Sequence, residues 1–124
     1  MGDLLIMPKR ILIAEDEQSS REMLSAFAIS QGYDVISAAD GGDLLLLASE
    51  EHFDLIITDL MMAGLDGVTA TDILKMHDKT TPIIVVTSLD QQETSFLENK
   101  FTKIYHKPGD FKELFDYIGS LIGN

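Results

Sequence analysis

Cysteine is absent from the 124 residues, which excludes a disulfide framework and any metal site built on thiolates. Long apolar runs are absent as well: the longest hold four to six residues, whereas a membrane-spanning helix needs about 20. The first ten residues include an acid, Asp3, and too short an apolar stretch for a secretory signal. We therefore expect a cytoplasmic protein without a membrane span.

Positive charge is scarce, because 9 Lys and Arg residues face 21 Asp and Glu residues, a net charge of −12. Residues 1–74 hold 14 acids and 3 bases (−11), and residues 75–124 hold 7 acids and 6 lysines (−1). This balance argues against direct nucleic-acid binding, which needs Lys and Arg to replace counterions. Two interpretations remain open. The acids only solvate the surface, or some of them form a cation site while the later lysines mark a partner-facing surface.

The length and the 45% hydrophobic content fit a single folded domain. We expect a short leader at 1–8 and one domain at 9–124, in which apolar runs alternate with helix-like stretches. Strands are predicted at 10–14, 33–39, 55–58, 82–88 and 102–106. Helices are predicted at 19–32, 41–52, 68–77, 91–100 and 111–123. Ser19 and Glu22 have capping-box spacing, and Gly32 can end that helix. The fourth helix rests only on Phe96 and Leu97.

Strands alternating with helices predict an α/β fold, a doubly wound five-stranded parallel sheet with helices on both faces. Such sheets bind ligands outside the carboxyl ends of their strands, near the switch in strand order. The polar residues that follow the predicted strands should therefore converge at one edge. They are Glu15, Asp16, Asp59, Thr87, Ser88 and Lys107.

Carboxylates crowded at one edge repel each other, and Mg²⁺ relieves this because it prefers carboxylate and carbonyl oxygens. The Thr87 hydroxyl and the Lys107 ammonium would add donors for an oxyanion beside the metal. That combination suits phosphoryl transfer, in which a metal ion and a lysine neutralise charge on the moving group. Carboxylates can form aspartyl phosphates, and Asp59 stands alone at the end of its strand, so Asp59 is the candidate nucleophile.

Four segments, "ILIAEDE", "LIITDLMMAGLDG", "PIIVVTS" and "HKPGD", occur in an order and spacing that resemble the receiver domain of two-component response regulators. The resemblance covers about residues 10–122. It implies the flavodoxin-like strand order 2-1-3-4-5. It also implies a signalling protein that takes a phosphoryl group from a histidine kinase or a histidine phosphotransfer protein. A downstream protein or a linked output domain would then respond. No turnover of small molecules is expected.

By this resemblance, Asp59 is the phosphoacceptor and also contacts Mg²⁺. Asp16 would bind Mg²⁺ directly, Glu15 would hold it largely through water, and the backbone carbonyl of Met61 would be a further ligand.

Further along the chain, the resemblance makes Thr87 the switch hydroxyl and Lys107 the phosphate partner. Pro108 would fix the following turn, with a cis peptide bond before it. Phosphorylation would reorganise the surface of the fourth helix, fifth strand and fifth helix, where Lys100, Lys103 and Lys112 lie.

The sequence departs from the family pattern at four positions. Glu15 replaces the commoner Asp, Met62 stands where Pro is usual, and Ser88 replaces Ala and adds a hydroxyl to the switch region. Ile104 occupies the switch position at which the family usually has Tyr or Phe. Tyr105 is adjacent, but the two-residue period of a strand places it on the other face.

Simpler interpretations exist for several of these residues. Glu15 and Asp16 could cap the following helix, and Thr87 and Ser88 could cap the fourth. Asp66 and Gly67 read as a helix cap and a turn. The three histidines, 52, 77 and 106, share no metal-binding spacing and read as surface or packing residues. The pair Met61 and Met62 either packs in its loop or forms an exposed patch that meets a partner.

Two other functions remain as alternatives. One is a receiver-like interaction module that acts without phosphorylation, which the Ile104 departure favours. The other is an Mg²⁺-dependent phosphohydrolase with an aspartate nucleophile, and it fits poorly because Met61 stands where such enzymes place a second acid. The sequence allows a dimer through the last helices without requiring one.

Overall fold

The computed structural model describes residues 7–62, 64–78, 80–107 and 111–123. Its strands are β1 (Arg10–Ala14), β2 (Asp34–Ala38), β3 (Leu55–Thr58), β4 (Ile83–Thr87) and β5 (Lys103–His106). They form one parallel sheet of order β2-β1-β3-β4-β5, which confirms the predicted fold class and strand order. Each strand lies within two residues of its predicted bounds at either end. Residues 1–6 of the predicted leader lie outside the described residues, and Met7 and Pro8 precede β1 and are exposed.

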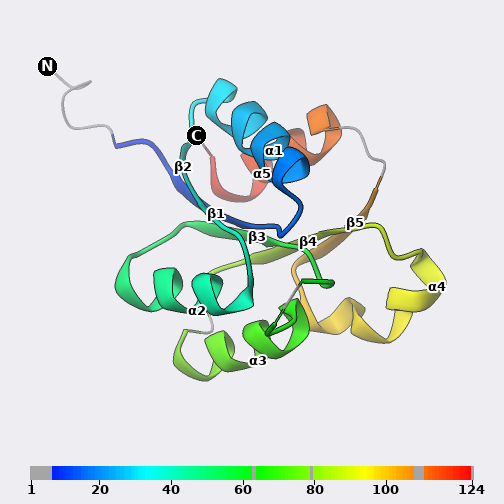
Figure 1. The fold of residues 1–124 in the computed structure, drawn as a ribbon. Coiled ribbons are helices and arrows are strands. Elements are labelled where there is room, and N and C mark those ends of the chain that lie inside the picture. Colours follow the sequence, from blue (N-terminus) through cyan, green and yellow to red (C-terminus); the bar gives the residue numbers. More distant parts are fainter. Residues whose placement is uncertain (1–6, 63, 79, 108–110, 124) are drawn as a thin grey trace, which may run out of the picture.

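Helices cover both faces of the sheet (Figure 1). They are α1 (Gln18–Ser30), α2 (Gly41–Glu50), α3 (Gly67–His77), α4 (Gln91–Thr94), the 3-10 helix η2 (Ser95–Lys100) and α5 (Phe111–Ile122). Helices α1 and α5 lie on one face, and α2, α3 and the α4–η2 segment lie on the other. Within the described part of the chain, none of these helices is long and apolar enough to cross a membrane.

Two buried clusters form the core, one on each face of the sheet. Successive strand residues alternate between them: Leu12 packs with α2 and α3, whereas Ile11 and Ile13 pack with α1 and α5. This alternation follows from the two-residue period of a strand. Ile104 and Tyr105 obey the same rule and lie on opposite faces, as the sequence predicts.

The start of α1 differs from the prediction. Its N-cap is Glu17, whose carboxylate accepts hydrogen bonds from Ser19 N (3.3 Å), Ser20 N (2.6 Å) and Ser19 Oγ (2.5 Å). The predicted capping box at Ser19 and Glu22 is therefore wrong. Glu22 instead accepts from the Gln18 side chain one turn before it. The capping residue is also not Glu15 or Asp16, so their simpler interpretation as caps fails.

The fourth helical segment spans the predicted residues 91–100, but only its first part is an α-helix. Asp90 and Glu93 form a capping box that starts α4, but the α-helix lasts only one turn before the chain tightens into η2. The two buried residues of the segment, Thr94 and Leu97, are three positions apart, which is the repeat of a 3-10 helix. The cap is Asp90, and thus neither Thr87 nor Ser88 serves as one.

Candidate functional site

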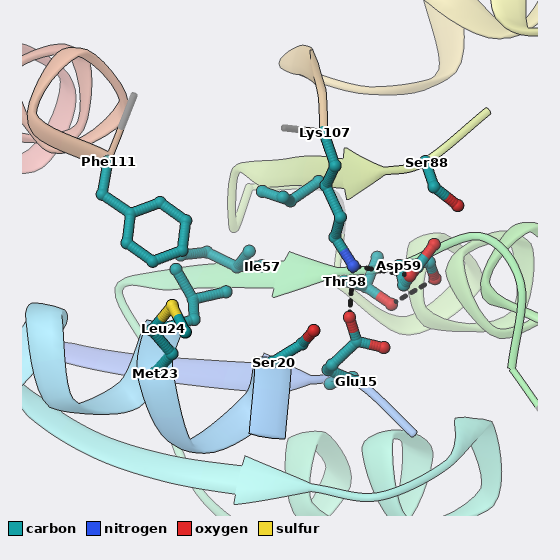
Figure 2. A pocket seen from close by; sticks show the side chains of 12 residues that line it. Glu15, Ser20, Met23, Leu24, Ile57, Thr58, Asp59, Ser88, Lys107 and Phe111 are labelled. Atoms are coloured by element: carbon teal, nitrogen blue, oxygen red, sulfur yellow. Dashed lines mark hydrogen bonds and ion pairs between the residues drawn. The ribbon is translucent and has the colours of Figure 1, made fainter. Parts of the chain in front are cut away.

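The carboxyl ends of β1, β3, β4 and β5 bring together the side chains that the sequence singles out. Glu15 and Asp59 directly follow β1 and β3, and Lys107 follows β5, so that residues 44 and 48 positions apart meet at one edge of the sheet. Figure 2 shows the Lys107 side chain reaching between the carboxylates of Glu15 and Asp59. Both carboxylate side chains are buried, and Lys107 is 27% exposed.

Lys107 is the cation that compensates the two buried carboxylates. Its Nζ donates to Asp59 Oδ2 at 3.1 Å and to Glu15 Oε1 in a second, shorter contact. Burial raises the pKa of Glu15, and the nearby charge of Asp59 raises it further, against the lowering effect of Lys107. Burial lowers the pKa of Lys107, but its hydrogen bond to Glu15 and the charge of Asp59 outweigh burial and raise that pKa overall. The site thus holds two acids against one ammonium.

Backbone contacts fix Asp59. Its N–H donates to Ala14 O at 3.0 Å, and its Oδ1 accepts from Met61 N at 3.2 Å. Gly67, the first residue of α3, packs against this segment so closely that a Cβ there would lie 2.2 Å from Asp59 O. Only glycine allows α3 to begin beside the phosphoacceptor candidate, which is more than the turn role expected for it. Asp66 is the N-cap of α3, as predicted.

The loop after β4 is bonded to the end of β5. Thr87 is fully buried, its O accepts from Lys107 N at 2.6 Å, and its Oγ1 accepts from Leu89 N at 3.2 Å. His106 Nδ1 lies 2.7 Å from Leu89 O, so the ring donates to that carbonyl. Ser88 is exposed. His106 is expected from the sequence only at the surface or in packing, and no sequence pattern predicts its bond to this loop.

Asp16 and Met61 lie at the exposed margin of the site. Asp16 is exposed and Met61 has 61% of its surface accessible, whereas Met62 is buried in the core on the α2 and α3 face. Packing therefore anchors the loop at the position where the family usually has Pro. Arg21 Nη1 donates to Glu15 O at 2.8 Å and holds the β1–α1 loop in place. Pro108 and its peptide bond lie outside the described residues.

The candidate metal ligands at this site have the chemistry that Mg²⁺ requires. The candidate ligands are oxygens, which Mg²⁺ prefers, and two buried carboxylates share the one ammonium of Lys107. Across the described residues, however, no three His, Cys, Asp or Glu side chains already lie in a metal-holding group. Lys107 occupies the space between Glu15 and Asp59. A metal ion would have to recruit the exposed Asp16 and compete with that ammonium.

An apolar cavity of about 460 Å³ opens beside the acids. Met23, Leu24, Ile57 and Phe111 form its apolar side in Figure 2, opposite Lys107 and the carboxylates. Its apolar walls lower the local dielectric, which strengthens the contacts that Lys107 makes.

Known proteins resemble this chain in sequence. The sequence model described as "Response regulator receiver domain" matches residues 11–119. The "Probable transcriptional regulator ycf27" of Porphyridium aerugineum is 42% identical over 116 residues, which cover 92% of this chain and 48% of that protein. The chain spans between about a fifth and a half of the length of the first curated relatives it matches.

Solved structures of receiver proteins have a similar fold. The receiver domain of the sensor histidine kinase PA1611 from Pseudomonas aeruginosa PAO1, with a magnesium ion coordinated in its active-site cleft, has a TM-score of 0.87 at 27% identity and covers 95% of this chain and 100% of that chain. The response regulator TrrA of Thermotoga maritima, in complex with Mg²⁺-BeF, has a TM-score of 0.84 at 26% identity, covering 91% and 98%. With the family model matching most of its length, the chain belongs to the response regulator receiver domains of two-component signalling.

Proposed function

We propose that the chain is a phosphorylation-controlled switch in which Asp59 accepts a phosphoryl group with Mg²⁺ in the site. The observation that carries the proposal is the buried Asp59 carboxylate at the end of β3, held 3.1 Å from Lys107 Nζ. An isolated buried carboxylate is costly, and this one is kept beside a cation at the edge where such sheets bind ligands.

The donor is the phosphohistidine of a histidine kinase or a histidine phosphotransfer protein. An Asp59 carboxylate oxygen attacks phosphorus, the bond from phosphorus to the imidazole nitrogen breaks, and the imidazole leaves with that electron pair. Lys107, which already contacts Asp59 Oδ2, binds an oxygen of the transferred group. The Thr87 hydroxyl donates to a second oxygen. Its oxygen can keep accepting from Leu89 N at the same time, because a hydroxyl has one donor hydrogen and two acceptor lone pairs.

Mg²⁺, bound by Asp16, Asp59, the Met61 carbonyl and, largely through water, Glu15, would neutralise charge on the phosphoryl group. Hydrolysis at Asp59 resets the switch, so the chain catalyses its own phosphotransfer and dephosphorylation without turning over small molecules. A downstream protein or a linked output domain reads the result from the surface of α4, β5 and α5.

An acyl phosphate such as acetyl phosphate tests the proposal, with intact-mass spectrometry as the measurement. Wild type should gain one phosphoryl group only with Mg²⁺, and Asp59→Asn should gain none. Asp54→Asn is the matched control, since Asp54 is a half-buried acid at the opposite end of the same strand and bonds Arg10 N at 2.8 Å. Equal labelling of wild type and Asp59→Asn would exclude Asp59. No Mg²⁺-dependent labelling of wild type would favour the interaction module.

A further inference from the structure

A second hollow lies between the β3–α3 loop and the α4–η2 segment. It measures about 470 Å³, and we call it the α3–α4 groove. The residues that matter for its chemistry are Met61, Val68, Leu89 and Phe96, which are apolar, and Asp66 and Glu93, which are acidic.

Two large exposed apolar side chains lie on the two walls of the groove. Phe96 is 79% exposed at the start of η2, and Met61 is 61% exposed on the facing loop. The residues next to them in sequence, Leu97 and Met62, are buried in the core. Loose packing of these segments therefore does not explain the exposure of Phe96 and Met61. Exposed aromatic and methionine side chains around one hollow are typical of a protein-binding surface.

Fixed negative charge borders this apolar surface. Among the described residues that line the groove, two are charged, both are carboxylates, and each is held in place by a helix cap. Asp66 accepts from Thr69 N at 2.8 Å, and Glu93 accepts from Asp90 N at 3.0 Å. A second copy of a chain with net charge −12 would bring like charges together, so a segment with positive charge is the better occupant.

We propose that the α3–α4 groove is a docking site for a basic amphipathic helix of a partner protein. The apolar face of that helix covers Met61, Leu89 and Phe96, and its Lys or Arg side chains lie against Asp66 and Glu93. Binding of an amphipathic helix in a hydrophobic groove is an established mode of recognition, with anchors at i, i+3, i+4 and i+7.

Hydrogen bonds connect both walls of the groove to the phosphoacceptor site. On one wall Met61 N donates to Asp59 Oδ1 at 3.2 Å, and on the other Leu89 N donates to Thr87 Oγ1 at 3.2 Å. A phosphoryl group on Asp59 would offer new acceptor oxygens to Met61 N and to the Thr87 hydroxyl, and the change in these two hydrogen bonds would move Met61 and Leu89. Docking and phosphorylation should therefore affect each other equally in free energy. This coupling rests on the proposed function, but the groove itself does not.

The direct test uses a synthetic helical peptide of Leu, Lys and Ala with leucines at i, i+3, i+4 and i+7. Two control peptides carry Glu in place of Lys, or the same residues in scrambled order. Titration followed by amide chemical shifts should show saturable binding of the basic helix at Met61, Leu89 and Phe96. The acidic and scrambled peptides should bind at least about tenfold more weakly. Equal binding of the scrambled peptide, or shifts confined to another face, would overturn the proposal.

Variants locate the contact. Phe96→Ser should weaken binding about tenfold or more, because burial of a Phe side chain is lost. The matched control is Met76→Ser, another strongly exposed apolar residue (76%) on α3 but outside the groove, and it should bind as wild type does. Glu93→Gln keeps an acceptor for Asp90 N and should reduce the salt dependence of binding. If Phe96→Ser instead abolished a concentration-dependent self-association seen without peptide, a second copy would be the occupant and the proposal would be wrong.

Beryllofluoride with Mg²⁺, a mimic of the phosphoryl group, tests the coupling. The affinity of wild type for the basic helix should change about fivefold or more, and Asp59→Asn should bind the helix without that change. An adduct that forms and leaves affinity unaltered would disprove the coupling. If no adduct forms while groove binding persists, the proposed phosphoacceptor function fails and the docking site stands.

Discussion

Replacing Lys107 by Met is the most informative single change, because it removes a charge while keeping the length of the side chain. Lys107 contacts both Glu15 and Asp59, and both acids are buried. The variant leaves two carboxylates facing each other without their cation. We expect the variant to be less stable than wild type at neutral pH. This deficit in stability should become smaller as the pH is lowered.

The size of the effect follows from burial. Removing one partner of a buried ion pair costs about 3–5 kcal/mol of unfolding free energy. Because Lys107 is 27% exposed, solvent screens part of its charge, and we expect about 2–3 kcal/mol instead. For a domain of this length that corresponds to a fall in Tm of roughly 8 °C.

The pH dependence has a definite sign. The pKa of Lys107 is raised above its ordinary value of 10.5, so its stabilisation is complete below that pH and is lost as pH rises through the folded-state pKa. In the variant, Glu15 loses the hydrogen bond and the charge of Lys107, both of which lower its pKa, so the pKa of Glu15 should be higher than in wild type. Protonation of Glu15 then relieves its repulsion with Asp59. The stability difference should therefore be large at neutral pH and small near about pH 4.

Urea unfolding followed by circular dichroism at the two pH values measures this difference. The control is Lys100→Met, which removes an exposed ion pair with Asp72 (3.2 Å) and should cost no more than about 1 kcal/mol at either pH. A Lys107→Met deficit as small as that of the control would refute the reasoning. So would a deficit that is unchanged at the lower pH.

Three further predictions concern residues around the site. His106→Val should cost about 1 kcal/mol and speed amide exchange in the loop after β4, because the Leu89 carbonyl loses its donor; His106→Asn, which can still donate, should recover most of this. Glu17, whose pKa is lowered to about 2 by hydrogen bonds from the start of α1, stabilises the fold above its ordinary pKa of 4.5 and loses that effect as pH falls through about 2; melting curves of Glu17→Gln and wild type should therefore converge in strong acid. Gly67→Ala should cost about 1–3 kcal/mol in urea unfolding and reduce Mg²⁺-dependent labelling, because its Cβ would lie 2.2 Å from Asp59 O; normal labelling would show that the loop adjusts.

The fold class and the meeting of the site residues could be predicted because both follow from local pattern, whereas the strand order is implied by the family resemblance. The apolar stretch at 55–58 has the length of a buried strand, and a parallel sheet places whatever follows it at the binding edge. The two-residue period then separates Ile104 from Tyr105, whose ring packs edge-on near Tyr117 of α5. No knowledge of distant contacts is needed for these steps.

Other features depend on geometry that spacing does not encode. The cap of α1 is decided by which carboxylate reaches the first free amides, and Glu17 reaches them where Ser19 does not. The bond from His106 to Leu89 joins positions 17 residues apart through the exact placement of a loop. The close contact between Gly67 and the backbone of Asp59 depends on where α3 packs, which sequence spacing does not determine.

Lys107 connects stability to the proposed chemistry. The ammonium that offsets the charge of Glu15 and Asp59 also occupies the space between the oxygens that would bind Mg²⁺. A metal ion must therefore displace part of an interaction that stabilises the fold, which weakens its apparent affinity. Lys107→Met should then bind Mg²⁺ more tightly than wild type and be stabilised more by it in thermal melts. Its acceptance of a phosphoryl group should nevertheless fall, because the transferred oxygens lose their cation. Opposite changes in metal affinity and in phosphorylation would separate the two roles of a single side chain.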